Sequence, residues 1–218
     1  YQYIIDHDAT PGELNFEGYK YSTCVSVNDM VCHGCPSKDI LIHDGDLIKV
    51  DTVIDYHGYL SDACHAFVAG TASPAVQKLM DVTLKALYLG IDQAVVGNRI
   101  GDIGFAIQDY AENQMGYGVV REYIGHGIGP TMHEEPDVPH YGKAGHGTRL
   151  KAGMTITIEP MINIGDWRCG DPADDGWTIR TLDGSLSCQY EHTLVVTDDG
   201  PKILTSVDPV MDAPYLLK

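Results

Sequence analysis

The stretch Leu47–Val68 reads Leu-Ile-Lys-Val-Asp-Thr-Val-Ile-Asp-Tyr-His-Gly-Tyr-Leu-Ser-Asp-Ala-Cys-His-Ala-Phe-Val. Two runs rich in β-forming residues, Leu47–Ile54 and Tyr59–Val68, flank a segment of turn-forming residues, Asp55–Gly58. Alternating apolar residues on both sides of such a segment predict a β-hairpin.

Two aspartates lie inside this hairpin. If the loop is centred between Tyr56 and His57, Asp51 and Asp62 lie directly opposite each other. Like charges in that position destabilise a sheet, so shared protons or bound cations must compensate for them. The alternative is a register slip that turns one of the two carboxylates to solvent.

A second pair of carboxylates occurs in the C-terminal half. Glu159 lies within Thr155–Met161, and Glu191 lies within Ser187–Leu194, both of which are β-rich. Glutamate is disfavoured inside strands, and an uncompensated buried carboxylate is costly. Both halves therefore carry strands with carboxylates inside them, which indicates a duplicated architecture.

The remaining elements set the fold class. Strands come first, two helices follow, and further strands end the chain, which predicts an α+β fold with an antiparallel sheet and helices on one face. A hairpin is expected around Asp183-Gly184. The expected strands are Ser22–Cys32, Met154–Ile164, Trp177–Leu182, Leu186–Val196 and Lys202–Ser206, and the expected helices are Thr71–Val96 and Asp102–Gln114.

The segment Gly125–Pro136 reads Gly-His-Gly-Ile-Gly-Pro-Thr-Met-His-Glu-Glu-Pro. Its glycines permit close backbone approach and unusual φ/ψ angles around His126. A dinucleotide loop is disfavoured because Pro130 replaces its third glycine, and the helical zinc motif lacks its second histidine. The segment alone is equally compatible with a plain surface loop.

Together, His126 and the four carboxylates form a coherent set of metal ligands. Their charge of about −4 matches two divalent cations, and oxygen-rich ligands with one imidazole suit Mn, Fe, Co or Zn at hydrolytic two-metal centres. The residues alone therefore predict a dinuclear hydrolase.

Composition excludes several classes of protein. The chain has 218 residues, 44% of them hydrophobic, and contains no apolar run of the roughly 20 residues that a membrane span needs. Its net charge of −17 repels nucleic acid and anionic membranes. Six cysteines show no disulfide framework, so reduced thiols are expected. The single Cys32–Cys35 motif is weak evidence for zinc binding or redox chemistry.

Five separated blocks, in order, resemble methionine aminopeptidases of the M24 type. The short connection from His126 to Glu159 resembles type I enzymes. The blocks are Val27-Asn28 through Cys32-His33-Gly34, Lys49-Val50-Asp51 with Ser61-Asp62, Gly125–Gly129 with His133–Pro136, Thr157–Met161 and Gln189–His192.

The resemblance implies the "pita-bread" α+β fold, in which two pseudo-symmetric halves surround a two-metal site. Residues 1–218 would form a single catalytic domain, with a first half of about residues 21–115 and a second of about 116–206. The N-terminal helical segment usual in the family is expected to be absent.

The resemblance also implies roles for single residues. Glu159 would act as general base, His133 would hydrogen-bond the scissile peptide, and His33 would help to hold the substrate. The implied metal ligands are Asp51, Asp62, His126, Glu159 and Glu191. The implied substrate pocket comprises Phe16, Tyr19, Cys24, His33, Met132, His133 and Trp177, and a monovalent-cation site comprises Asn28, Met30 and Ser187.

Three positions depart from the family pattern. Phe16 replaces a frequent tyrosine, Met132 stands where relatives often have an aromatic residue, and Glu13 falls where relatives place Cys or Pro.

The implied function is removal of the initiator methionine from nascent proteins and peptides, through attack of a metal-bridging water or hydroxide on the first peptide bond. Two divalent ions (Co, Mn, Fe or Zn) are expected, in a cytoplasmic monomer that acts close to the ribosome and binds neither nucleic acid nor membrane. One alternative is an Xaa-Pro aminopeptidase or prolidase, which shares the five ligands. The other is a non-catalytic pita-bread binding protein, although such relatives typically lose metal ligands.

Overall fold

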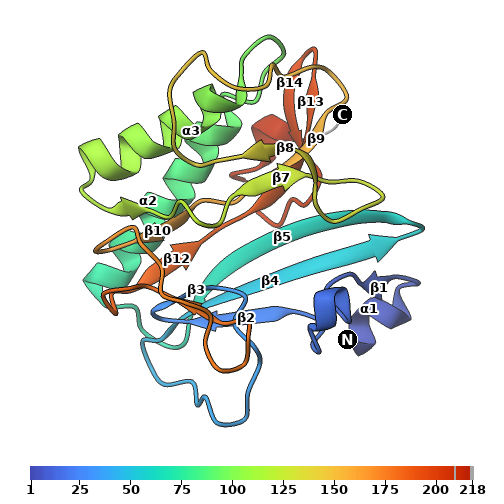
Figure 1. The fold of residues 1–218 in the computed structure, drawn as a ribbon. Helices are drawn as coiled ribbons and strands as arrows, with labels where there is room; N and C mark the ends of the chain where they lie inside the picture. Colours follow the sequence, from blue (N-terminus) through green and yellow to red (C-terminus); the bar gives the residue numbers. More distant parts are fainter. Residues whose placement is uncertain (209, 217–218) are drawn as a thin grey trace.

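The long hairpin of β4 (Leu47–Tyr56) and β5 (Tyr59–Val68) crosses the middle of the molecule (Figure 1). This computed structural model describes residues 1–208 and 210–216. The predicted hairpin is confirmed, but its predicted register is wrong. Asp51 pairs with Cys64 and Asp62 pairs with Val53, so the two aspartates share one face of the hairpin without lying directly opposite each other.

The turn explains the difference in register. Only two residues, His57 and Gly58, connect the strands, and both have positive φ, at 55° and 84°. Two left-handed residues in succession form the type I′ turn, whose twist matches that of a hairpin. The expected four-residue loop would have its centre one residue earlier in the chain, which shifts every pair.

The first half adds short strands around this hairpin. On the side of β4 away from β5 lie β1 (Thr10–Pro11) and β2 (Cys24–Val27). The single strand expected over 22–32 is split into β2 and β3 (Met30–Cys32), and β3 pairs with β11 (Ile179–Arg180). The chain begins with the short helix α1 (Gln2–Asp6), and the 3-10 turn η1 (Phe16–Gly18) precedes β2.

The second half contains two further antiparallel sheets. The larger has the order β14-β13-β9-β7-β8 and the smaller has the order β12-β10-β6. The strands of the larger sheet are β7 (Gly125–Gly127), β8 (Glu134–Val138), β9 (Thr155–Ile158), β13 (His192–Thr197) and β14 (Gly200–Ile203). Those of the smaller are β6 (Gly118–Val119), β10 (Met161–Asn163) and β12 (Ser187–Gln189).

Two expected strands are interrupted at matching positions. The strand expected over 154–164 is split into β9 and β10 at Glu159-Pro160, and the strand over 186–196 is split into β12 and β13 at Tyr190-Glu191. Ile158 pairs with His192 before the break and Met161 pairs with Gln189 after it. The register therefore continues through the gap and places Glu159 opposite Glu191.

Two other sequence-based expectations are wrong. The segments on either side of Asp183-Gly184 do not pair with each other, because β11 pairs with β3 and β12 pairs with β10. The segment after Pro136, whose residues to Gly147 are expected from the sequence to form a loop, includes the end of β8, which pairs with β7. Alternation along a strand shows which face is buried but does not identify the partner strand.

The two expected helices are present with different bounds. Helix α2 (Pro74–Ile91) begins at an N-cap, Ser73, whose hydroxyl accepts from the Val76 amide at 3.3 Å. Helix α3 (Ile100–Gln108) continues into a π-helical turn, η2 (Asp109–Gln114). Helix α2 packs on β9, β10 and β12, and α3 packs on β8, so both helices cover one face of the sheets (Figure 1).

Helix and strand residues together form one large apolar core, and the α+β prediction is confirmed. Its fully buried members include Leu79, Leu87, Ile103, Ile107, Ile156, Ile158, Ile162 and Leu194. Near the C-terminus a further 3-10 turn, η3, covers Ala213–Tyr215. Within the described part of the chain, no helix is both long enough and apolar enough to cross a bilayer.

A lysine side chain lies inside this structure. Lys49 of β4 is only 1% exposed, and its Nζ donates to the carbonyl oxygens of Asn28 at 3.0 Å and Ser187 at 2.8 Å. Burial lowers the pKa of Lys49 to about 8, so its ammonium is still mostly charged at neutral pH. The side chain thereby connects the first half of the chain to β12 in the second.

Candidate active site

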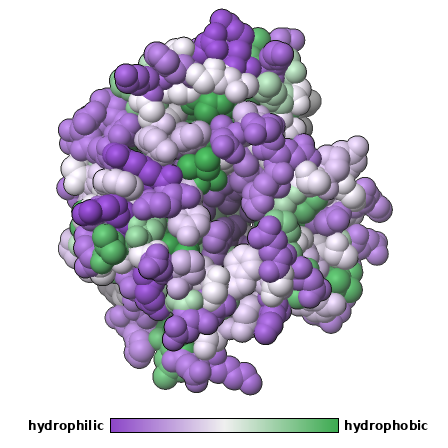
Figure 2. Space-filling model, in the orientation of Figure 1, coloured by the Kyte–Doolittle hydropathy of each residue, from purple (hydrophilic) through white to green (hydrophobic). Residues whose placement is uncertain are grey.

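A pocket of about 260 Å³ opens between the two halves. In the space-filling view, it corresponds to the hollow at the centre of a largely hydrophilic face (Figure 2). Most of the residues expected at the site line this pocket, although they come from segments distant in sequence. They are Phe16, Tyr19, Cys24, His33, Asp51, Asp62, His126, Met132, His133, Glu159 and Trp177.

The four expected carboxylates are largely removed from water. One oxygen each of Asp51, Asp62 and Glu191 is buried without a hydrogen-bond partner among the described residues. Burial raises the pKa of all four carboxyl groups, and the charge of Asp62 raises those of Asp51, Glu159 and Glu191 further. Crowded, desolvated carboxylates with unsatisfied oxygens fit bound cations.

His126 reaches this cluster because the glycines around it let strands approach closely. A Cβ on Gly125 would lie 2.6 Å from the carbonyl oxygen of Thr157, and one on Gly127 would collide with the carbonyl of Glu135. The expectation of close approach is thus confirmed. The expectation of unusual backbone angles is wrong, since neither of these glycines has a positive φ.

The imidazole of His126 is oriented for metal binding. Its Nδ1 lies 2.9 Å from the carbonyl oxygen of Gly127, which can only accept, so Nδ1 carries the proton. Nε2 therefore presents its lone pair, 3.8 Å from Asp62 Oδ2 and 3.6 Å from Glu159 Oε1. Burial lowers the pKa of His126 to about 4, which keeps the ring neutral.

Three ligand atoms, one each from Asp62, His126 and Glu191, lie within 4.8 Å of one another. The backbone of Asp62 is fixed by Thr193, whose Oγ1 accepts from its amide at 2.9 Å and donates to its carbonyl at 2.8 Å. The amide of Glu191 donates to the Cys64 carbonyl at 2.9 Å. The two halves are thus joined where their carboxylates meet, and the residues fit a divalent-metal centre.

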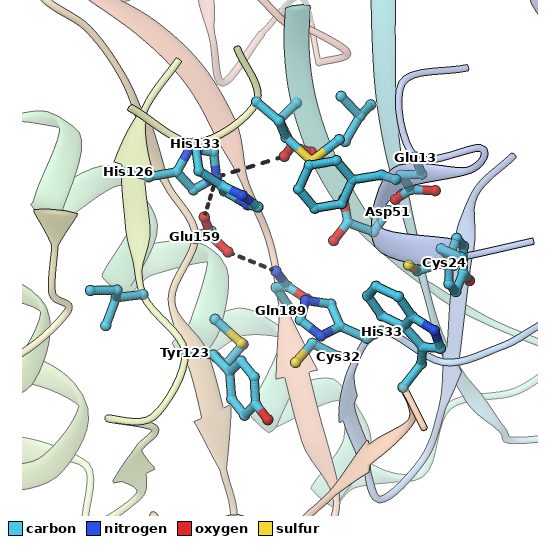
Figure 3. Close-up of a pocket in the computed structure, with 18 of the residues that line it drawn as sticks. Glu13, Cys24, Cys32, His33, Asp51, Tyr123, His126, His133, Glu159 and Gln189 are labelled. Atoms are coloured by element: carbon cyan, nitrogen blue, oxygen red, sulfur yellow. Dashed lines mark hydrogen bonds and ion pairs between the residues drawn. The ribbon is translucent and has the colours of Figure 1, made fainter. Parts of the chain in front are cut away.

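Glu159 is held by its own neighbours. Its Oε1 accepts from Thr157 Oγ1 at 2.8 Å, and its Oε2 lies 3.5 Å from Gln189 Nε2 (Figure 3). The backbone amide of Glu159 donates to Nε2 of the buried His140 at 3.1 Å. Neither His140 nor Gln189 was among the expected site residues.

Three aromatic contacts place the other two expected histidines. His133 is exposed at the pocket mouth, 4.5 Å from the His126 ring and 5.4 Å from the Phe16 ring, both edge to face. His33 packs at 6.3 Å against Trp177 on the far wall. Partial desolvation against the pocket wall lowers the pKa of His133, and burial lowers that of His33 to about 4, so both rings are neutral donors at pH 7.

The pocket holds a carboxyl group that was not among the expected pocket residues. Glu13 is 7% exposed, and its Oε2 has no hydrogen-bond partner among the described residues. Burial and then the charge of Asp62 raise the pKa of Glu13. In Figure 3 it lies beside Cys24 and Asp51, across the pocket from His126. Its departure from the family pattern was the only signal in the sequence.

Further pocket residues were also missed, among them Cys32, Tyr123, Gln189 and Met161. All six cysteines are free, as expected. Of the expected monovalent-cation residues, Asn28 and Ser187 come together, since the Ser187 amide donates to the Asn28 carbonyl at 3.1 Å. Met30 is buried, and its sulfur accepts from the Val27 amide at 3.3 Å.

Known proteins share this architecture. Methionine aminopeptidase A of Synechocystis is 49% identical over 199 residues, which cover 91% of this chain and 78% of the relative. The crystal structure of methionine aminopeptidase from Rickettsia prowazekii superposes with a TM-score of 0.92 at 42% identity, over 94% of this chain and 82% of that one. The prolidase from Pyrococcus furiosus is more distant, with a TM-score of 0.67 at 26% identity, over 86% of this chain and 50% of the prolidase.

These structural neighbours share the pita-bread fold, so the expected fold is confirmed. The sequence profile of "Metallopeptidase family M24" matches residues 2–198. With this match across most of its length, the chain belongs to metallopeptidase family M24.

Proposed function

We propose that this chain is a methionine aminopeptidase of type I, which removes the N-terminal methionine from peptides and nascent proteins. One observation carries the proposal: the lone pair of His126 Nε2 faces the buried carboxylates of Asp62 and Glu159 at the edge of a pocket with aromatic walls. The names of the similar proteins agree with it.

Five residues would hold two divalent ions of Co, Mn, Fe or Zn. They are Asp51, Asp62, His126, Glu159 and Glu191. When bound, such ions lower the pKa of water and polarise a peptide carbonyl. The unpartnered oxygens of Asp51, Asp62 and Glu191 support this assignment, since buried acceptors without donors match cations.

The remaining chemistry falls to side chains of the chain. Glu159 is suited to the role of general base, because its pKa is raised by burial and Thr157 fixes its Oε1. His133 and His33 are neutral imidazoles, each with one N–H to donate toward the scissile peptide. Donors aimed at the charge that develops on the carbonyl oxygen are usually large contributors to rate.

The pocket supports methionine as the first side chain. Phe16 and Trp177 supply aromatic surface, Tyr19 and Cys24 are buried beside them, and Met132 completes the wall. Aromatic edges and soft sulfur atoms are favourable neighbours for a thioether. Because nascent chains carry the initiator methionine, we also expect a cytoplasmic monomer that works close to the ribosome.

A comparison of two peptides tests the proposal against the prolidase alternative. Metal-loaded protein should cleave Met-Ala-Ser and leave Ala-Pro-Gly intact. Cleavage of Ala-Pro-Gly alone would overturn the assignment in favour of the prolidase reading.

The apo-protein should be titrated with Mn, Fe, Co and Zn, with bound metal and turnover measured on the same samples. Full metal loading with no cleavage of any peptide would favour the non-catalytic alternative.

A further inference from the structure

The Lys49 side chain is almost completely buried without a carboxylate partner. None of the ion pairs among residues 1–208 and 210–216 includes it. A buried ammonium needs compensation, and lysine is rarely found fully buried unless it is paired. Its surroundings must therefore supply oxygen atoms in place of a counter-ion.

Backbone carbonyls supply these oxygens. Nζ donates to the carbonyl of Asn28 at 3.0 Å and to the carbonyl of Ser187 at 2.8 Å. The same Asn28 carbonyl accepts the Ser187 amide at 3.1 Å. Carbonyl oxygens turned toward one point are also the ligands that replace the water around a monovalent ion. Asn28 and Ser187 are two of the three residues expected to hold such an ion.

The backbone around Asn28 is fixed in this arrangement. Asn28 lies in the tight turn between β2 and β3, at a left-handed φ of 52°. Its side-chain Nδ2 donates to Asp46 Oδ1 at 2.7 Å, and its Oδ1 accepts the Leu47 amide at 3.0 Å. Both ends of the Asn28 side-chain amide are therefore held by other partners, and only the backbone carbonyl oxygen of Asn28 contacts Lys49.

We infer that the Lys49 ammonium takes the place of the monovalent cation, so that this chain carries a covalently tethered cation where an ion was expected. An ion on the same two oxygens would meet a like charge at close range inside the protein, where water screens poorly. The residues expected for a free monovalent ion therefore do not fit one in this chain.

The position of Lys49 gives its ammonium, in place of the ion, a structural role. Lys49 and Asp51 are two apart on β4, so their side chains leave the strand on the same face. Ser187 begins β12, which leads directly to Glu191. The ammonium thus joins β4, which carries Asp51, to β12, the strand that precedes Glu191. A tethered cation keeps this connection at any concentration of Na+ or K+.

Thermal unfolding tests the inference without relying on peptidase activity. Wild-type protein is compared in sodium, potassium and choline chloride at one ionic strength. Its unfolding midpoint should be the same in all three. Lys49→Ala removes the donor from the Ser187 carbonyl, leaves the Asn28 carbonyl with only the Ser187 amide, and opens a space, so its midpoint should fall by roughly 5–10 °C in choline chloride. Sodium or potassium should restore at least half of that loss, with saturation.

A matched control separates specific from general salt effects. Lys151→Ala removes one positive charge from an exposed position and should show no difference among the three salts. The inference is overturned if the wild-type midpoint rises saturably with sodium or potassium but not with choline. It is also overturned if folded Lys49→Ala gains nothing from either ion. Should Lys49→Ala fail to fold, 23Na line widths of the wild-type protein decide: broadening that added potassium reverses would contradict the inference.

Discussion

The two carboxylate pairs of the site are built by different means. Asp51 and Asp62 lie on an uninterrupted hairpin, two register positions apart on one face. Glu159 and Glu191 lie opposite each other where both strands are interrupted. In this chain the continuous hairpin carries its carboxylates in staggered positions, whereas the directly opposed pair lies where the ladder is open. Regular pairing orients the first pair, and local contacts such as Thr157 to Glu159 orient the second.

The largest effect is expected when a charge is removed from the staggered pair, Asp51 and Asp62. Asp62→Asn keeps the shape of the side chain but removes one negative charge next to His126 Nε2. We expect peptidase activity to be lost, with reduced metal content measured by mass spectrometry. Thr52→Ala on the same hairpin serves as the control. Normal turnover of Asp62→Asn with full metal loading would reject the two-metal site.

A smaller loss of peptidase activity is expected when a residue outside both carboxylate pairs is changed. His133→Ala removes a donor at the mouth of the pocket and should reduce kcat/KM for Met-Ala-Ser by roughly 10²-fold. Its metal content should match that of wild-type protein, because the ring contacts His126 and Phe16 and no carboxylate of the cluster is within hydrogen-bond distance. Metal loss in this variant would show that His133 is a ligand.

The stability of the metal-free protein should depend on pH, because the carboxyl groups of both pairs are crowded and buried. Burial raises the pKa of Asp51, Glu159 and Glu191 well above the usual range and raises that of Glu13 to about 8, so the folded metal-free chain holds protons on carboxyl groups that are ionised in the unfolded chain. These carboxyl groups make stability fall as pH rises, and Lys49, whose lowered pKa acts in the opposite sense, offsets only part of that fall. Between about pH 7 and pH 8, where histidines are mostly neutral in both states, the unfolding midpoint should drop by several degrees. Saturating Mn²⁺ should remove this slope, and a slope unchanged by metal would mean that other groups cause it.

The smallest effect concerns the carboxyl group outside both pairs. Glu13→Gln replaces a buried acid of raised pKa with a neutral group of the same shape. At about pH 8 the metal-free variant should unfold roughly 2–4 °C higher than wild type, which corresponds to about 1 kcal/mol. Glu17→Gln changes an exposed acid in the same segment and should have no such effect. A lower midpoint for Glu13→Gln would show that its charge is satisfied in the folded state.

The sequence predicted the parts of the fold that depend on local pattern. The hairpin, both helices and the α+β class followed from periodicity and turn residues, and all seven expected substrate-pocket residues line one pocket. The partner of β11 was not predictable, because pairing with β3 joins segments about 150 residues apart. The register was missed because it depended on whether two or four residues form the turn.

The site shows the same division between local and distant information. Carboxylates in strand segments were visible from the sequence, since a polar residue in an apolar run stands out. Glu13 was not identified as part of the site, because it lies in an irregular segment that has no periodicity to violate. The contact of Lys49 with Ser187 joins residues 138 positions apart, so only the folded chain brings the ammonium to that carbonyl.

The matched interruption of β9–β10 and β12–β13 has a consequence for how the enzyme can vary. The gap is bounded by backbone pairs on both sides, Ile158 with His192 and Met161 with Gln189. Its width is therefore set by strand spacing, which changes little, and not by the loops that surround it. Insertions in the long connections over 139–154 or 164–178 can alter what approaches the pocket while the spacing of the two glutamates is preserved. The spacing of Glu159 and Glu191 and the choice of substrate can thus evolve separately.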